Sequence, residues 1–402
     1  MLRRFGVRNP ALAFVLLVGL VSLFADMTYE GARSATGPYL ALLGASATAV
    51  GFVAGFGELI GYGFRLISGF FSDRTGRYWP VTLWGYGLNL FAVPMLALTH
   101  RWELAALLIV LERLGKGIRT PARDTMLSHA TASMGRGWGF GLHEAMDQTG
   151  AVVGPLIVAG VLFAGGSYRT GFALLAIPAV LALSVLLVAR LSYPRPRDLE
   201  VSETSLETRG FQRHFWLYLL AVSLVAAGFT DFALIAFHFQ KQSIISADLI
   251  PVFYAAAMAA DSIAALIMGR LFDRVGLPVL AVVSLLSALF APLVFLDGAA
   301  GAFVGIALWG LGVGAQESIM RAAVANMVSA ERRGTAYGVF NAGYGVSWFV
   351  GSALMGILYD ISIPLLVAFS ITMELASIPL FILVHRWIQG GKSGLSPDGA
   401  TS

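Results

Sequence analysis

Three ionisable residues stand inside the first long apolar segment of the chain, where their types and spacing could carry proton chemistry. Asp26, Glu30 and Arg33 follow one another at intervals of four and three residues, so a helix places all three on one face. Glu30 and Arg33 can form an ion pair, and Asp26, nearer the middle of the segment, is the better candidate for a proton carrier. Ionisable side chains in apolar segments are costly and usually face a cavity or a partner.

Two further apolar segments carry charges that could complete such a site. Glu58 lies near the middle of the second segment, and Arg113 and Lys116 lie deep in the fourth. Both cations need a carboxylate or an anionic substrate at that depth. We therefore hypothesise that Arg113 pairs with Asp26 or Glu30, and that proton binding to the acid loosens the pair.

Other charged residues lie nearer the ends of their segments. Arg119 and Arg123 are close enough to the end of the fourth segment for their head groups to extend to the membrane surface. In the fifth segment, His143 and Asp147 are four residues apart and share a helix face, so they could relay protons. A lone histidine near a helix end more often has a structural role.

The second half of the chain carries fewer charges within its apolar segments. Asp231 and Glu317 are its candidate members of a coupling or substrate site. For all these charged residues, the alternative is a set of buried ion pairs that hold helices together. Aromatic residues that are expected to shape a substrate cavity are Phe229, Phe232, Phe237, Tyr254, Tyr344 and Trp348.

The segments that would position these residues are long and apolar. Hydrophobic residues make up 57% of the 402 residues and charged residues 12%, about half the charged share of soluble domains. Apolar runs of about 20 residues, long enough to cross a membrane as helices, recur along the whole chain. The short alternating segments of a membrane β-barrel are absent from the sequence. We predict an all-α integral membrane fold with twelve transmembrane helices, at residues 11–40, 46–71, 79–98, 103–126, 137–163, 171–193, 214–238, 250–272, 277–296, 301–325, 334–359 and 362–387.

These segments divide the chain into two halves of six helices each. Residues 1–193 are predicted to form an N-terminal six-helix bundle and residues 214–390 a C-terminal one. Between them, residues 194–213 contain prolines and acidic residues and are interpreted as a cytoplasmic linker. The tail 391–402, rich in Gly and Ser, is predicted to be disordered.

Lysine and arginine are distributed unevenly between the two sides of this topology. With the N-terminus inside, the cytoplasmic segments carry most of them, and the other side carries only Arg101, Arg169 and Lys241. The positive-inside rule then places both termini in the cytoplasm. Short loops and compact termini favour a prokaryotic cytoplasmic membrane. This distribution accounts for the net charge of +4 without a nucleic-acid partner.

One loop motif occurs after the second and again after the eighth predicted helix. Its glycines permit a tight turn, and its aspartate can accept hydrogen bonds from the free amides that begin a neighbouring helix. By symmetry, Asp73 would cap the helix that begins near Gly334, and Asp273 the helix that begins near Gly137. We interpret both copies as a cytoplasmic gate, with a solvated surface turn as the alternative. The gate residues are Gly69, Asp73, Arg74, Gly76 and Arg77 in the first copy and Gly269, Asp273, Arg274 and Gly276 in the second.

With these motifs, the chain resembles the major facilitator superfamily over nearly its full length. The first copy of the loop motif, residues 69–77, matches the superfamily's signature between helices 2 and 3. Its recurrence in the second half is typical of parallel repeats that pivot around a site at the membrane midplane. The resemblance implies two pseudo-symmetric six-helix bundles.

Two further runs resemble signatures of proton-coupled exporters in that superfamily. Arg113 and Lys116 belong to the first run, in which the matching arginine of the family is implicated in proton coupling. Gly150, Gly154 and Pro155 resemble the antiporter signature of exporters. Apart from the family, the spacing of the two glycines suits close packing between helices.

The sequence gives no sign of an enzyme. It lacks a GxxxxGK[ST] phosphate loop, an HExxH motif and a GxSxG motif, and its six histidines show no metal-ligand spacing. We expect no metal and no cofactor. The expected partners are the lipid bilayer, a small-molecule substrate and protons, and we expect a monomer.

Three functional hypotheses remain open. The first is secondary active transport by alternating access, with proton-coupled export of a small amphipathic compound. The second is proton-linked uptake of a small organic anion, which Arg33, Arg113 and Lys116 would favour. The third is a membrane sensor or lipid-handling protein with the same fold and no gradient-driven flux.

Overall fold

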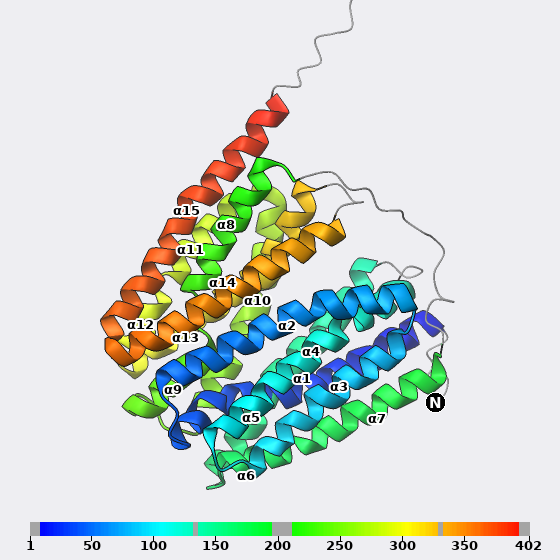
Figure 1. Cartoon of the computed structure of the whole chain (residues 1–402), viewed down its shortest axis with the longest axis vertical. Helices are drawn as coiled ribbons and strands as arrows, with labels where there is room; N and C mark the ends of the chain where they lie inside the picture. The colour runs from blue at the N-terminus through cyan, green and yellow to red at the C-terminus, as the bar shows by residue number, and fades with distance from the viewer. Residues whose placement is uncertain (1–8, 132–135, 195–210, 329–332, 394–402) are drawn as a thin grey trace, which may run out of the picture.

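The structure, a computed structural model, describes residues 9–131, 136–194, 211–328 and 333–393. In these ranges every regular element is helical, which confirms the predicted all-α fold (Figure 1). The first half contains α1 (Pro10–Leu42), α2 (Ala47–Thr75), α3 (Tyr78–Met95), η2 (Leu96–Leu98), α4 (Trp102–Thr131), α5 (Arg136–Phe163), α6 (Tyr168–Leu174) and α7 (Ala176–Ser192). The second half contains α8 (Arg213–Gly228), α9 (Phe232–Gln242), α10 (Ile250–Val275), α11 (Pro278–Ser287), α12 (Phe290–Phe295), α13 (Ala299–Met327), α14 (Arg333–Ile361) and α15 (Ile363–Ser393).

Eleven helical segments among the described residues are long and apolar enough to cross a membrane. The pairs α6–α7, α8–α9 and α11–α12 each form one such segment, interrupted by a break. Helix α4 is equally long but too highly charged to meet that measure of apolarity, and it makes the twelfth crossing. Its charged residues are Glu103, Glu112, Arg113, Lys116, Arg119, Arg123 and Asp124.

In both halves the repeated loop motif ends its helix at a glycine with a positive φ. Gly76 follows α2 with φ of 66°, and its N–H donates to the Ser72 carbonyl at 2.8 Å. Gly276 follows α10 with φ of 79°, and its N–H donates to the Phe272 carbonyl, also at 2.8 Å. Glycine adopts a positive φ without the steric cost that a side chain adds, so the tight turn can follow the helix directly.

The helices form two bundles, α1–α7 and α8–α15, which lie beside each other in Figure 1. We call the membrane side where α1 begins and α7 and α15 end the terminal side, and the other the distal side. The bundles meet chiefly where α2 packs against α14, α1 against α9, and α5 against α10. The predicted linker 194–213 and tail 391–402 lie largely outside the described residues.

Helices α1 and α5 approach each other through glycine. A Cβ atom added at Gly154 would lie 2.8 Å from the Met27 Cα and closer still to the Met27 carbonyl oxygen, and one added at Gly150 would lie 2.9 Å from the Asp26 Cβ. This contact fixes the position of the charged residues of α1 along the axis of α5. Pro155, which follows directly in the same helix, lies inside α5.

The first testable prediction concerns this contact. We expect Gly154→Val to destabilise the protein by about 1–3 kcal/mol or more, because the added side chain forces the two helices apart. Thermal denaturation of the purified protein in detergent measures the effect. Gly160→Val is the matched control in the same helix, since a Cβ there would meet nothing within 4 Å. Equal melting temperatures for the two variants would contradict close packing at Gly154.

Candidate functional site

A cavity of about 500 Å³ lies between the two bundles. Helices α1, α2, α4 and α5 line it on one side, and α10, α13 and α14 on the other. It extends from Glu30 and Trp309 in its depth to Asp124 and Phe140, which lie toward the terminal ends of their helices. The cavity therefore reaches from the middle of the molecule toward the terminal side.

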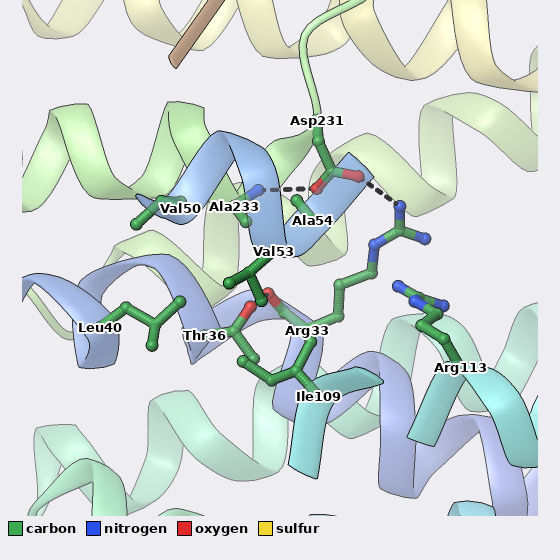
Figure 2. Close-up of a pocket in the computed structure, with 10 residues that line it drawn as sticks. All are labelled: Arg33, Thr36, Leu40, Val50, Val53, Ala54, Ile109, Arg113, Asp231 and Ala233. Carbon is green, nitrogen blue, oxygen red and sulfur yellow. Dashed lines mark hydrogen bonds and ion pairs between the residues drawn. The ribbon is translucent and has the colours of Figure 1, made fainter. Parts of the chain in front are cut away.

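An ion pair between the bundles closes the cavity toward the distal side. The Arg33 guanidinium of α1 donates to the Asp231 carboxylate at 3.3 Å, and Figure 2 shows the two side chains pointing toward each other. The second oxygen of Asp231 accepts from the Ala233 N–H at 3.0 Å and so caps α9. Behind this pair lies a void of about 20 Å³, lined by apolar side chains such as Leu40 and Val53. This void has room for about one water molecule.

A second contact between the bundles lies farther toward the distal side. Asp360, near the end of α14, accepts hydrogen bonds from the Thr48 N–H at 2.8 Å and from its hydroxyl at 2.7 Å. The carboxylate of one bundle thus caps the first turn of α2 in the other. Tyr168 adds a bond from its hydroxyl to Gln240 at 3.3 Å. The distal side is therefore closed by polar contacts as well as by packing.

Glu30 is the most connected carboxylate of the cavity wall. It lies 3.5 Å from the Lys116 ammonium and 4.0 Å from the Arg33 guanidinium, and it accepts from the Tyr254 hydroxyl at 2.5 Å. Tyr254 belongs to α10 in the second bundle. Arg33 also contacts Glu58 of α2 at 3.4 Å. These contacts join α1, α2 and α4 to each other and to the second bundle, as the ion-pair alternative from the sequence requires.

The hypothesis that Arg113 pairs with Asp26 or Glu30 is wrong. Arg113 lies 3.5 Å from Glu58 and 3.4 Å from Glu112, and Lys116 instead reaches Glu30 on α1. The reason lies in α2: a Cβ at Gly57 would stand 3.0 Å from the Arg113 side chain, so the glycine leaves room for the arginine on the α2 side of α4.

Asp26 has a different environment from Glu30. It is buried and accepts a hydrogen bond from the Tyr29 hydroxyl. Among the described residues, no cationic nitrogen lies within 4.0 Å of its carboxylate. Adding a proton to Asp26 therefore breaks no ion pair, whereas adding one to Glu30 would release Lys116 and Arg33.

The two candidate relay residues of α5 contact α1 and α4. His143 Nε2 lies 2.9 Å from the Ser22 hydroxyl, and its Nδ1 lies 3.9 Å from the Asp147 carboxylate. Arg123 lies 3.9 Å from Asp147 and 2.9 Å from Asp124. Arg123 is thus held inside the protein by two carboxylates, and the expectation that it extends to the membrane surface is wrong.

Arg119 is also inside the protein, against the sequence expectation. Its exposed fraction is 1%, and its guanidinium lies over the Tyr86 ring at 4.2 Å and near the Tyr29 ring at 5.5 Å. The close contact of α3 with α4 buries it, because a Cβ at Gly85 would lie 2.7 Å from the Arg119 Cβ. The signal that could have found it is a glycine on α3 at the level of an arginine on α4.

The second bundle contributes mostly aromatic and polar groups to the cavity. Tyr254, Tyr344 and Trp348 line it as expected, but Phe229, Phe232 and Phe237 are buried elsewhere in the packing of that bundle. The candidate Glu317 lines the cavity, and sequence reasoning did not assign Trp309 to it. Within the described residues, no group of three His, Asp or Glu side chains is arranged to hold a metal ion.

The structure does not test the predicted gate caps of the loop motif. Gly137 and Gly334 lie in the first turns of α5 and α14, but their surroundings are not described, so the predicted caps by Asp73 and Asp273 stay predictions. Asp73 accepts a hydrogen bond from the Tyr78 hydroxyl at 3.3 Å.

The fold and the cavity define a class of protein: a multi-pass membrane transporter with a charged cavity between two helical bundles. The chain belongs to the Major Facilitator Superfamily, whose family model matches residues 15–352 and 218–396. This agrees with the resemblance seen in the sequence.

Similar proteins are found among both sequences and structures. The chain is 43% identical over 394 residues to the "Uncharacterized protein Rv2265" of Mycobacterium tuberculosis (strain H37Rv), with 96% of each protein covered. It resembles a POT family transporter crystallised with a thioalcohol conjugated peptide, with a TM-score of 0.76, 12% identity and coverage of 94% of this chain and 96% of that one. It also resembles the nucleoside transporter NupG, with a TM-score of 0.72, 13% identity and coverage of 94% and 99%. At these identities the two structures show the fold alone.

Proposed function

We propose that this protein is a proton-coupled secondary transporter of small organic solutes that works by alternating access. The observation that carries the proposal is the asymmetry of the central cavity. It extends toward the terminal side, while Arg33–Asp231 and Thr48–Asp360 join the bundles on the distal side. A pair of bundles that can exchange such contacts from one side to the other exposes the cavity to each side in turn.

The proton-coupling part of the proposal is supported by carboxylates in the first bundle. Asp26, Glu30 and Asp147 all line the cavity, and Asp26 is buried without a cationic partner among the described residues. Buried acids in a membrane transporter are typical of proton pathways. With both termini in the cytoplasm, as the distribution of basic residues favours, the cavity faces the cytoplasm.

Two directions of coupling are supported by different observations. The sequence signatures around Arg113 and Gly154 favour export in exchange for protons. Two cations of the cavity wall without a nearby carboxylate in the ranges that the structure covers, described below, favour movement of an organic anion together with protons. The two directions differ in the sign of proton flow, so a single experiment separates them.

The experiment uses liposomes that contain the purified protein, a pH-sensitive dye and a concentrated solute. The solutes are 2-naphthoate, the neutral 2-naphthamide and a cationic naphthylmethylammonium. We expect the efflux of at least one solute to move protons, with acidification inside for exchange and alkalinisation inside for cotransport. Solute flux without proton movement would contradict proton coupling. Binding without any flux would favour the sensor or lipid-handling class.

A further inference from the structure

Two cations of the cavity wall have no carboxylate within 4.0 Å in the part of the chain that the structure describes: Arg65 and Arg119. Arg65 is partly buried, and its guanidinium lies over the Tyr62 ring at 4.6 Å. Arg119 is the extreme case because it is 1% exposed, and its Nε and Nη1 atoms have no hydrogen-bond acceptor. A buried charge without a counter-ion costs several kcal/mol, which an anion entering the cavity would offset.

A second cation lies beside Arg119. Lys116 is three residues earlier on α4 and therefore on the same helix face. Its ammonium lies 4.1 Å from the centre of the Tyr29 ring, the ring that Arg119 approaches at 5.5 Å. Lys116 is only partly buried, and the Glu30 carboxylate is 3.5 Å away. An anionic group next to Tyr29 would thus meet two cations, one of which has no carboxylate within 4.0 Å among the described residues. It would also lie near Asp26, which accepts from the Tyr29 hydroxyl.

All cations among the described lining residues come from the first bundle. They are Arg33, Arg65, Arg113, Lys116, Arg119 and Arg123. The described lining residues of the second bundle include Trp309, Tyr344 and Trp348 but no cation. The Trp348 Nε1 is a buried donor without an acceptor. The cations of the first bundle, which share their wall with carboxylates such as Asp26 and Glu30, can therefore hold an anionic group. The facing wall offers aromatic surface and a spare donor to an organic body, beside its own carboxylates, Asp261 and Glu317.

We propose that Lys116 and Arg119 bind the anionic group, a carboxylate or a phosphate, of an amphipathic organic substrate whose apolar body packs against Trp309 and Trp348. The inference rests on the proposed function in taking the central cavity as the substrate site. It adds the chemical class of the substrate. An organic cation at the same place would leave Arg119 without a counter-ion and would be repelled by its charge.

The test is a binding measurement on the full-length protein in detergent, by isothermal titration calorimetry. The probes are 2-naphthoate, 2-naphthyl phosphate and the neutral 2-naphthamide, so that the first two compare carboxylate with phosphate. We expect at least one anion to bind about tenfold or more tightly than the amide, because the amide leaves Arg119 without a counter-ion. Arg119→Gln should raise the dissociation constant of that anion by about tenfold or more, toward that of the amide.

The matched control is Arg101→Gln, which removes an exposed cation just before the distal end of the same helix, paired with Glu103 at 3.2 Å. It should leave anion binding unchanged. If Arg119→Gln does not yield folded protein, Lys116→Gln carries the same expectation at the partly buried position. Equal binding of anions and amide, or no binding of either anion, would overturn the proposal.

Failure of this proposal and failure of the proposed function give different results. The calorimetry needs no gradient, so Arg119-dependent anion binding stands even if liposomes show no flux. Conversely, proton-coupled flux of the amide or of the cationic probe alone would support the transporter and overturn the anion site.

Discussion

Asp231→Asn is expected to open the distal side of the cavity while leaving the start of α9 intact. Asparagine can still accept from the Ala233 N–H, since it caps helices as well as aspartate does. The ion pair with Arg33, which spans the bundles at 3.3 Å, loses its charge. Removing one partner of a buried charge pair costs about 2–5 kcal/mol, and about 1.4 kcal/mol changes an equilibrium tenfold. The population open to the distal side should therefore rise about tenfold or more.

Cysteine labelling measures this shift without interference, because the chain contains no cysteine. Val53 lines the small void behind the ion pair and is 7% exposed. A membrane-impermeant maleimide added from the distal side should label Val53→Cys about tenfold faster or more when Asp231→Asn is also present. Asp297→Asn, an exposed change on a distal loop, is the control. An unchanged labelling rate in Asp231→Asn would show that the pair does not hold the distal side closed.

The helices were predictable because apolar length alone identifies a membrane crossing, but their breaks were not. The seventh crossing was predicted as the continuous helix 214–238, and the structure divides it into α8 and α9. The break leaves Asp231 free to cap α9 and to face Arg33. Hydropathy reports how many apolar residues follow one another, and it contains no information on where the backbone leaves the helix.

The sequence predicted how deep in the helices the charged residues of the site lie, but it did not predict which residues they pair with. Partners depend on how each helix is rotated and how closely its neighbours approach, and here single glycines decide both. Gly57 gives Arg113 its place on the α2 side, and Gly85 lets α3 cover Arg119. A helical pattern in one segment cannot show which glycine of another segment it will meet.

A carboxylate of one bundle caps a helix start of the other at a place that the sequence did not indicate. The loop motif predicts carboxylates that cap helix starts on the terminal side, where the surroundings of Gly137 and Gly334 are not described. On the distal side Asp360 makes such a contact, to the Thr48 N–H at the start of α2. Asp360 belongs to no repeated motif, so the sequence alone had no reason to assign it this role. Caps on both sides would give the two access states similar contacts to exchange.

Proton coupling is expected to depend on Asp26 more specifically than on any other carboxylate of the cavity. Its hydrogen bond comes from Tyr29, and a proton can be added without releasing a cation. Glu30, in contrast, holds Lys116, Arg33 and the Tyr254 hydroxyl of the other bundle. Asp26→Asn should therefore remove the group that binds the proton and leave the contacts between the helices intact. Glu30→Gln should weaken the contacts between helices and reduce transport itself.

The measurement compares proton movement with solute exchange in the same liposomes. In Asp26→Asn, solute-driven proton movement should fall to the level of protein-free liposomes, while exchange of labelled solute across the membrane persists. Glu30→Gln should lose both, and Glu103→Gln, an exposed change at the distal end of α4, should lose neither.

The position of Asp26 beside the proposed anion site also predicts the direction of coupling. The Tyr29 hydroxyl donates to Asp26, and the ring of the same tyrosine lies beside Lys116 and Arg119. A proton on Asp26 therefore removes negative charge next to the anion site. The proton and the anion then favour each other's binding, so the wild-type protein should move protons in the same direction as the anion, which is cotransport. Proton movement that persists in Asp26→Asn would assign the coupling to another group, with Asp147 the next carboxylate on the cavity wall.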